Sequence, residues 1–110
     1  MDKQKFNLIL DGLLEKTEQE KLEWETTADK NTFLLVLKDS AVSIRRGFEM
    51  TYIAYTLEFR NANGEVVESV TVLKADKSQL EKANRIFDSA SRQSLKTDPI
   101  VDRILEQLAA

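Results

Sequence analysis

The chain has 110 residues, of which 42% are hydrophobic and 32% are charged, and its formal net charge is −3. With one proline and three glycines, this composition excludes a disordered or low-complexity chain and suits a single domain over residues 1–110. Cysteine and histidine are both absent, which excludes disulfides and thiol or imidazole catalysis and predicts neither a metal site nor another cofactor.

The first predicted element is a helix over residues 3–18. Apolar residues recur there at the spacing of one helical face: Phe6, Ile9, Leu10, Leu13 and Leu14. Asp2 is placed to cap the first turn. Gly12 costs this helix about 1 kcal/mol relative to alanine, and two interpretations stay open, a tolerated glycine or a point of close approach. Acidic residues interrupt the apolar cluster too early for a signal peptide, so we expect no membrane association and a cytoplasmic location.

Three short apolar segments follow and predict strands. The first is centred on Leu22 and Trp24. The second, over residues 33–37, is apolar on both faces, which indicates an interior strand. The third contains Val42 and Ile44, and we expect it to end at Gly47.

The clearest pattern is a β-hairpin over residues 52–72, whose two alternating runs are joined by Asn61-Ala62-Asn63-Gly64. A four-residue loop with a positive φ at its glycine pairs Phe59 with Val66. A two-residue loop at Asn63-Gly64 pairs Phe59 with Glu68 instead. The matching of side chains across the strands favours the four-residue loop.

Two further helices are predicted after the hairpin. Ser78 and Glu81 form a capping-box pattern at the start of the first, while Asp98 is expected to cap the second and Pro99 to begin it. The second helix has an apolar face of five residues: Ile100, Val101, Ile104, Leu105 and Leu108.

These elements predict an α+β fold with an N-terminal helix, an antiparallel β-meander of four to five strands, and two C-terminal helices packed on one sheet face. We expect Leu57 and Phe59 to face the helical layer, with these neighbours: Leu13, Phe87 and Leu105.

Three segments carry a resemblance to other proteins: Lys21-Leu22-Glu23-Trp24-Glu25, Asn63-Gly64-Glu65-Val66-Val67-Glu68-Ser69 and Ser91-Arg92-Gln93-Ser94-Leu95. In their order along the chain, they resemble small uncharacterised bacterial α+β proteins. The resemblance implies a compact bacterial domain and carries over no catalytic residue.

The first candidate partner surface is a basic helix face formed by four residues, Lys82, Arg85, Arg92 and Lys96, which fall within a narrow arc of the helical wheel. A solvated helix face explains such a cluster, and the alternative is binding of nucleic acid or another anionic ligand. Acids dominate residues 15–29 and bases dominate residues 74–96, so we also expect opposite potentials at the two ends of the domain.

The second candidate surface is the sheet face that the helices leave uncovered. Tyr52 and Thr56 are expected there together with Val67, and Val36 adds apolar area. This pattern suits either a half-hydrated antiparallel face or an interface.

No nucleophile beside a base and no metal-ligand spacing is recognisable, so an enzyme is not predicted. The sequence favours a non-enzymatic protein–protein interaction module whose partner is another protein or a second copy of the chain. The alternative is a binder of nucleic acid or another anionic ligand through the basic helix face.

Overall fold

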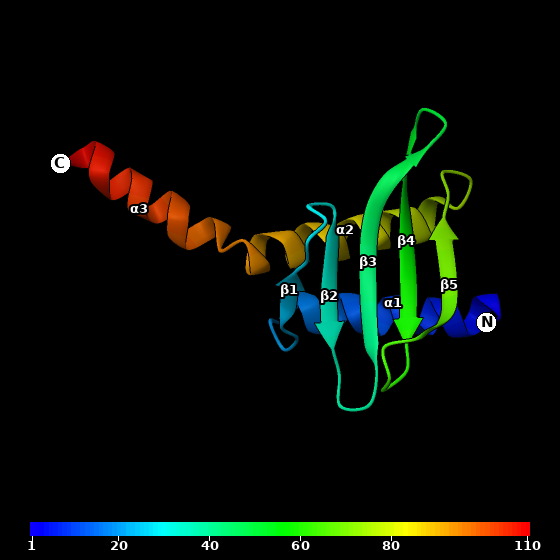
Figure 1. Ribbon diagram of the computed structural model, residues 1–110. Coiled ribbons are helices and arrows are strands. Elements are labelled where there is room, and N and C mark those ends of the chain that lie inside the picture. Colours follow the sequence, from blue (N-terminus) through cyan, green and yellow to red (C-terminus); the bar gives the residue numbers. More distant parts are fainter.

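The computed structural model describes all residues 1–110 and confirms the α+β class (Figure 1). The elements, in chain order, are α1 (Lys3–Glu18), β1 (Trp24–Thr26), β2 (Thr32–Val36), β3 (Ala41–Glu49), β4 (Tyr52–Arg60), β5 (Val66–Val72), α2 (Lys77–Ser94) and α3 (Thr97–Ala109). No helix is both long enough and apolar enough to span a membrane.

The strands form one antiparallel sheet of five strands in the order β1-β2-β3-β4-β5. The segment at Trp24 therefore joins the sheet, and β2 is an interior strand as predicted. The expected strand end at Gly47 is wrong, because Gly47 pairs with Ala54 and β3 continues to Glu49. The longer β3–β4 hairpin extends beyond the neighbouring strands (Figure 1).

The β4–β5 loop has the predicted chemistry but not the predicted register. The Gly64 amide donates to the Asn61 carbonyl oxygen at 3.0 Å, and Gly64 has a φ of 81°. Along the strands, however, Phe59 pairs with Glu68, so the favoured pairing with Val66 is wrong. Two shifts of one residue each are the physical reason. The turn closes between Asn61 and Glu65, so Arg60 pairs with Val66, and a β-bulge beside that pair then places Val67 as an extra residue in β5.

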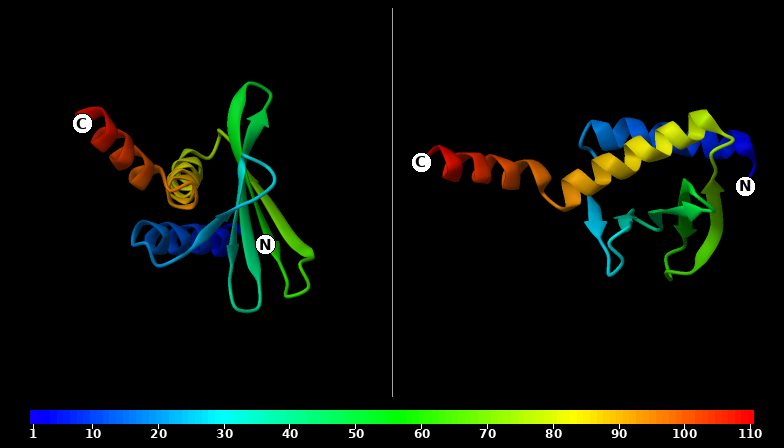
Figure 2. Two further views of the ribbon diagram at one scale, coloured as in Figure 1. Left: turned by 60° about the vertical axis from the view of Figure 1, so that its left-hand side comes forward. Right: turned by 90° about the horizontal axis from the view of Figure 1, so that it is seen from above.

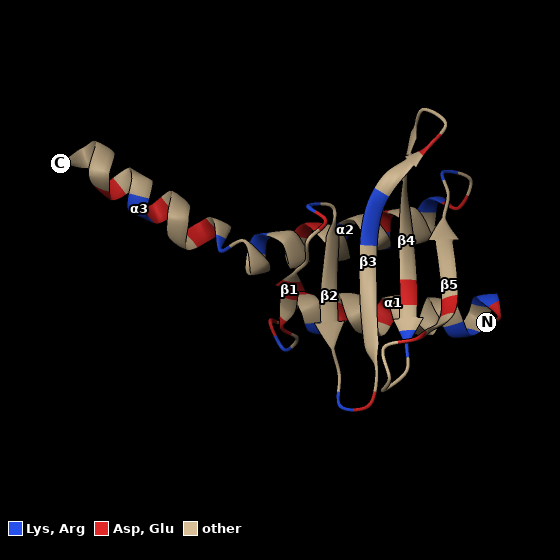
Figure 3. Ribbon diagram, viewed as in Figure 1, with Lys and Arg blue, Asp and Glu red and all other residues tan.

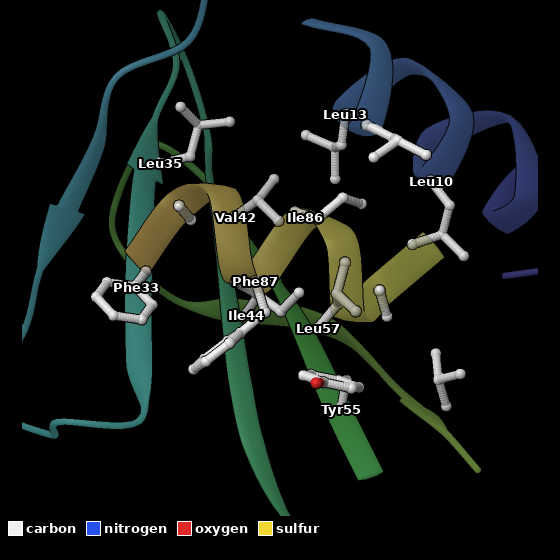
Figure 4. Packing of buried hydrophobic residues seen from close by; sticks show 14 of the residues in the cluster. Leu10, Leu13, Phe33, Leu35, Val42, Ile44, Tyr55, Leu57, Ile86 and Phe87 are labelled. Carbon is white, nitrogen blue, oxygen red and sulfur yellow. The ribbon is translucent and has the colours of Figure 1, made fainter. Parts of the chain in front are cut away.

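Helices α1 and α2 lie side by side on one face of the sheet and run across its strands (Figures 1 and 2). Between them and the sheet lies a core of 16 buried residues, including Leu10, Ile44, Leu57 and Phe87 (Figure 4). The Phe87 ring centroid lies 5.2 Å from that of Phe33 in an edge-on arrangement. Leu57 thus faces the helical layer with Leu13 and Phe87, as expected.

The helix starts show one correct and two wrong cap predictions. Asp2 accepts from the Lys5 amide at 2.8 Å and caps α1 as predicted. The start of α2 is capped by Asp76 rather than by the Ser78 capping box, because the Asp76 carboxylate accepts from the Gln79 amide. Lys96 occupies the cap position of α3 and makes no side-chain cap bond, while Asp98 lies within the first turn.

Helix α3 departs from the expected packing on the sheet. It projects past β1 and away from the sheet (Figures 1 and 2), and its inter-element contacts are with α2 alone. None of its residues is buried, so the expected place of Leu105 beside Leu57 is wrong. Only Leu95 and Lys96 separate the two helices, and Lys96 has a φ of 54°, so the connection directs α3 outward rather than back over the sheet.

Candidate functional site

The predicted basic face of α2 is largely neutralised within the chain. Lys82 pairs with Asp11 at 2.6 Å, and Arg85 makes a bidentate contact with Glu18 whose shortest distance is also 2.6 Å. Both acids come from α1, because α1 and α2 lie side by side. The other two members of the face lie near the C-terminal end of α2: Arg92, which pairs with Asp98 at 2.8 Å, and Lys96, which forms no ion pair.

These pairs also correct the expected separation of charge. The acidic and basic segments were expected at opposite ends of the domain, but Glu18 and Arg85 join them directly. Figure 3 shows acidic and basic residues distributed over neighbouring elements. The fold therefore places opposite charges next to each other.

The uncovered sheet face carries both predicted residues, Tyr52 and Thr56. The Thr56 hydroxyl lies 3.1 Å from that of Thr71 on β5, and the Lys74 ammonium lies 4.2 Å from the centre of the Tyr52 ring. Small and polar residues, including the buried Ser43, occupy the middle of this face. Small and polar side chains of this kind are typical of the side of an antiparallel sheet that no helix covers.

A buried tyrosine lies on the opposite, helix-covered face. The Tyr55 hydroxyl donates to the Asn84 side-chain oxygen, and the Arg46 guanidinium lies 4.6 Å from the centre of the neighbouring Phe87 ring. Burial raises the pKa of Tyr55, although Arg46 acts in the other direction. Tyr55 lines a cavity of about 400 Å³ between β4 and α2, together with Leu80 and Asn84. The cluster therefore supplies a neutral phenol held in place rather than a pair of acid–base groups.

Two exposed carboxylates have pKa values that hydrogen bonding lowers. For Asp29, the bonds come from the Asn31 amide and the Thr32 hydroxyl, which organise the loop between β1 and β2. For Glu68, the bonds come from the N-terminal ammonium at 2.7 Å and the Ser69 amide. The second contact ties the start of the chain to β5.

A polar cavity of about 520 Å³ lies where α1, α2 and α3 meet. No hydrophobic residue lines it, and its charged residues include Glu18, Arg92, Lys96 and Asp98. Because Glu18 and Arg92 already have partners of opposite charge, the cavity offers a mixed rather than a strongly anionic or cationic lining.

An apolar groove of about 500 Å³ runs between α1 and the ends of strands β2 to β5. Its wall on α1 includes Leu8, Ile9 and Gly12, and the sheet contributes Leu35 and Phe59 among others. The backbone of α1 packs against α2 and does not approach the backbone of any strand closely. The groove arises in the space between α1 and the sheet, and for this reason the sequence did not predict it. Val67, which was expected on the uncovered sheet face, lines this groove.

Gly12 opens the groove at its centre. A β-carbon built on Gly12 would meet no atom within 4 Å. The glycine is therefore not required by the packing of the chain itself, although it lowers helix propensity by about 1 kcal/mol. No segment of the chain approaches α1 closely at Gly12, so the structure supports the first sequence interpretation, a tolerated glycine.

Helix α3 carries an unpartnered apolar face, which we call the apolar stripe of α3. Its five side chains are 46% to 78% exposed: Ile100, Val101, Ile104, Leu105 and Leu108. The sequence predicted this stripe correctly, but the expectation that the stripe packs on the chain's own sheet was wrong.

Two further exposed apolar residues lie near the tip of the β3–β4 hairpin. Phe48 is 76% exposed and Met50 is 88% exposed. The sequence signal for them was the continuation of the alternating pattern past Gly47.

No family model, curated protein or solved structure matches the chain.

Proposed function

We propose that this protein is a non-enzymatic protein–protein interaction module that binds through the apolar stripe of α3. The observation that carries the proposal is a helix with an apolar face and no buried residue. Soluble chains bury such a face against another element, and this chain offers α3 only the end of α2. The stripe is therefore a surface for a partner.

The energetics support a partner for α3. The helix has 13 residues, a length at which an isolated helix is marginal in water. Covering five side chains that are about half exposed contributes roughly 1 kcal/mol each, or about 5 kcal/mol in total. This is more than half of the roughly 8 kcal/mol that corresponds to a micromolar complex.

The surfaces predicted from the sequence are weaker candidates. The uncovered sheet face is polar at its centre, and three of the four bases on α2 are engaged in ion pairs. Binding of nucleic acid or another anionic ligand through this face stays a prediction, and Lys96 is the one residue of the face without an ion pair. The proposed setting is the cytoplasm, because a chain without cysteine suits a reducing compartment.

Affinity capture with three full-length baits tests the proposal. The baits are the wild type, Leu105→Asp and the control Arg103→Gln, which changes the net charge by the same amount on the polar side of α3. The captured protein is either another protein or an untagged copy of this chain. Leu105→Asp is expected to lose at least 90% of the protein that the wild type captures specifically, and Arg103→Gln is expected to retain it. Equal capture by all three baits would overturn the proposal.

A further inference from the structure

We infer that the partner of the apolar stripe is a second copy of this chain, and that α3 of each copy docks in the apolar groove beside α1 of the other. This inference rests on the proposed function and names its partner. Each chain carries one unpartnered apolar helix and one unoccupied apolar groove. A two-fold exchange would satisfy both features twice in a closed assembly.

The dimensions of the two surfaces agree. The stripe runs from Ile100 to Leu108, and the α1 wall of the groove runs from Leu8 to Lys16. Each spans eight residue steps of helix, which is about 12 Å. The open space above Gly12 lies at the middle of that wall, where a docked helix would approach most closely. An amphipathic helix in an apolar groove is a common mode of peptide recognition.

The charges that border the two surfaces are complementary. The groove lining holds two bases, Lys16 and Arg60, and one acid, Glu68. Lys16 forms no ion pair within the chain. On the helical wheel, Asp102 borders the apolar stripe of α3 on one side and Arg103 borders it on the other, and both are exposed and unpaired. Docking of the apolar stripe would place this acid and this base at the two borders of the groove, where Lys16 and Glu68 offer the opposite charges.

The connection between α2 and α3 excludes docking of α3 in the groove of its own chain. Asp11 and Glu18 mark the side of α1 that faces α2, and Gly12 and Lys16 lie roughly 130° away around that helix. Since α2 and a helix in the groove would lie about 130° apart around α1, their axes would be about 15–18 Å apart. The three steps from Ser94, the last residue of α2, to Thr97, the first residue of α3, span at most about 10–11 Å. A short connection of this kind favours exchange between chains.

Two full-length variants separate the two halves of the contact. Gly12→Phe fills the groove and leaves α3 intact, and its side chain enters open space, so the fold is expected to survive. Leu105→Asp places a charge in the apolar stripe and leaves the groove intact. Leu8→Glu is a second groove variant at a residue that is 65% exposed. Circular dichroism and the fluorescence of Trp24 establish that each variant is folded.

Light scattering on a size-exclusion column, at about 100 μM chain, measures the result, because a contact of micromolar Kd is nearly saturated there. The wild type is expected at twice the chain mass of 12.6 kDa, and each variant alone at the mass of one chain. Each variant alters both contacts of its own dimer, so we expect self-association to weaken by roughly 100-fold per contact, or about 10⁴-fold in total. An equimolar mixture of Gly12→Phe and Leu105→Asp keeps one intact contact, because the intact α3 of one fits the intact groove of the other. The average mass of the mixture is therefore expected to rise above that of either variant alone.

Three results would overturn the inference. A monomeric wild type would exclude the second copy, and the proposed function would still stand if the capture experiment showed a stripe-dependent partner. A dimer that is lost in Leu105→Asp but survives both groove variants would show that two α3 helices pair with each other. Two monomeric variants that stay monomeric when mixed would show that stripe and groove do not form one contact.

Discussion

Replacement of Leu57 by alanine tests the assignment of the two sheet faces. Leu57 lies in the middle of β4, has no exposed surface, and pairs with Ile44 on one side and Val70 on the other. Because strands flank it and the helical layer covers it, the surroundings have little freedom to collapse into the space that alanine leaves. Substitutions of this kind cost 2–5 kcal/mol, and we expect about 3–4 kcal/mol here. That is between about a fifth and about four fifths of the total stability of a typical chain of this length, about 5–16 kcal/mol.

The matched control is Thr56→Ala, one residue away on the opposite face. It removes a hydroxyl pair with Thr71 that lies on the uncovered side, so the expected loss is below about 1 kcal/mol. Urea denaturation followed by the fluorescence of Trp24, the only tryptophan, measures both free energies of unfolding. Phe59→Ala is expected to cost less than Leu57→Ala, about 2 kcal/mol, because Phe59 is only partly buried beside the groove. Equal losses in Leu57→Ala and Thr56→Ala would refute the assignment of a covered and an uncovered face.

Three further variants test other parts of the structure. Burial raises the pKa of Tyr55 above its unfolded value of about 10, so the stability that depends on the neutral phenol is present below pH 10 and is lost as pH rises through the folded-state pKa. Tyr55→Phe should therefore flatten the decline in the free energy of unfolding between about pH 9 and 11, as measured by denaturation curves. An unchanged slope would contradict this prediction. Gly12→Ala should raise the stability of the dilute monomer by about 0.5–1 kcal/mol, because the new methyl group meets no atom, and a loss would show that the space beside Gly12 is filled within the chain. Because Arg85 and Arg92 are engaged in ion pairs, we expect the wild type to cause no mobility shift of nucleic acid, even at low salt. A salt-sensitive shift would instead support binding of nucleic acid through the basic face of α2, and the double variant Arg85→Glu and Arg92→Glu should then abolish that shift.

Local sequence patterns were sufficient for most of the elements. The apolar spacing and Asp2 predicted α1 at its observed bounds, and alternation predicted the strands of the meander. The β4–β5 register was not predictable in the same way, because the turn closes one residue later along β4 than the favoured loop requires, and a bulge beside it adds a second shift of one residue. Turn chemistry therefore specified the loop, and packing along the whole strand specified the pairing.

The candidate site shows the same limit at the level of packing. The apolar periodicity of α3 predicts that one face of the helix is buried, but it does not predict which surface buries that face. The groove depends on the distance between α1 and the sheet, which no local pattern encodes. In the same way, Arg85 could be assigned to a basic face from its spacing, whereas its pairing with Glu18 requires two helices that are distant in sequence to lie side by side.

Amide hydrogen exchange of α3 tests the docking of α3 in the groove most directly. Wild type and Gly12→Phe are compared at about 100 μM chain, and exchange is followed in the segment Thr97–Ala109, which the substitution does not touch. We predict slow exchange of this segment in the wild type and at least tenfold faster exchange in Gly12→Phe, because a 13-residue helix without a partner opens readily. Equal exchange in both proteins would contradict the assignment of the groove as the site that receives α3.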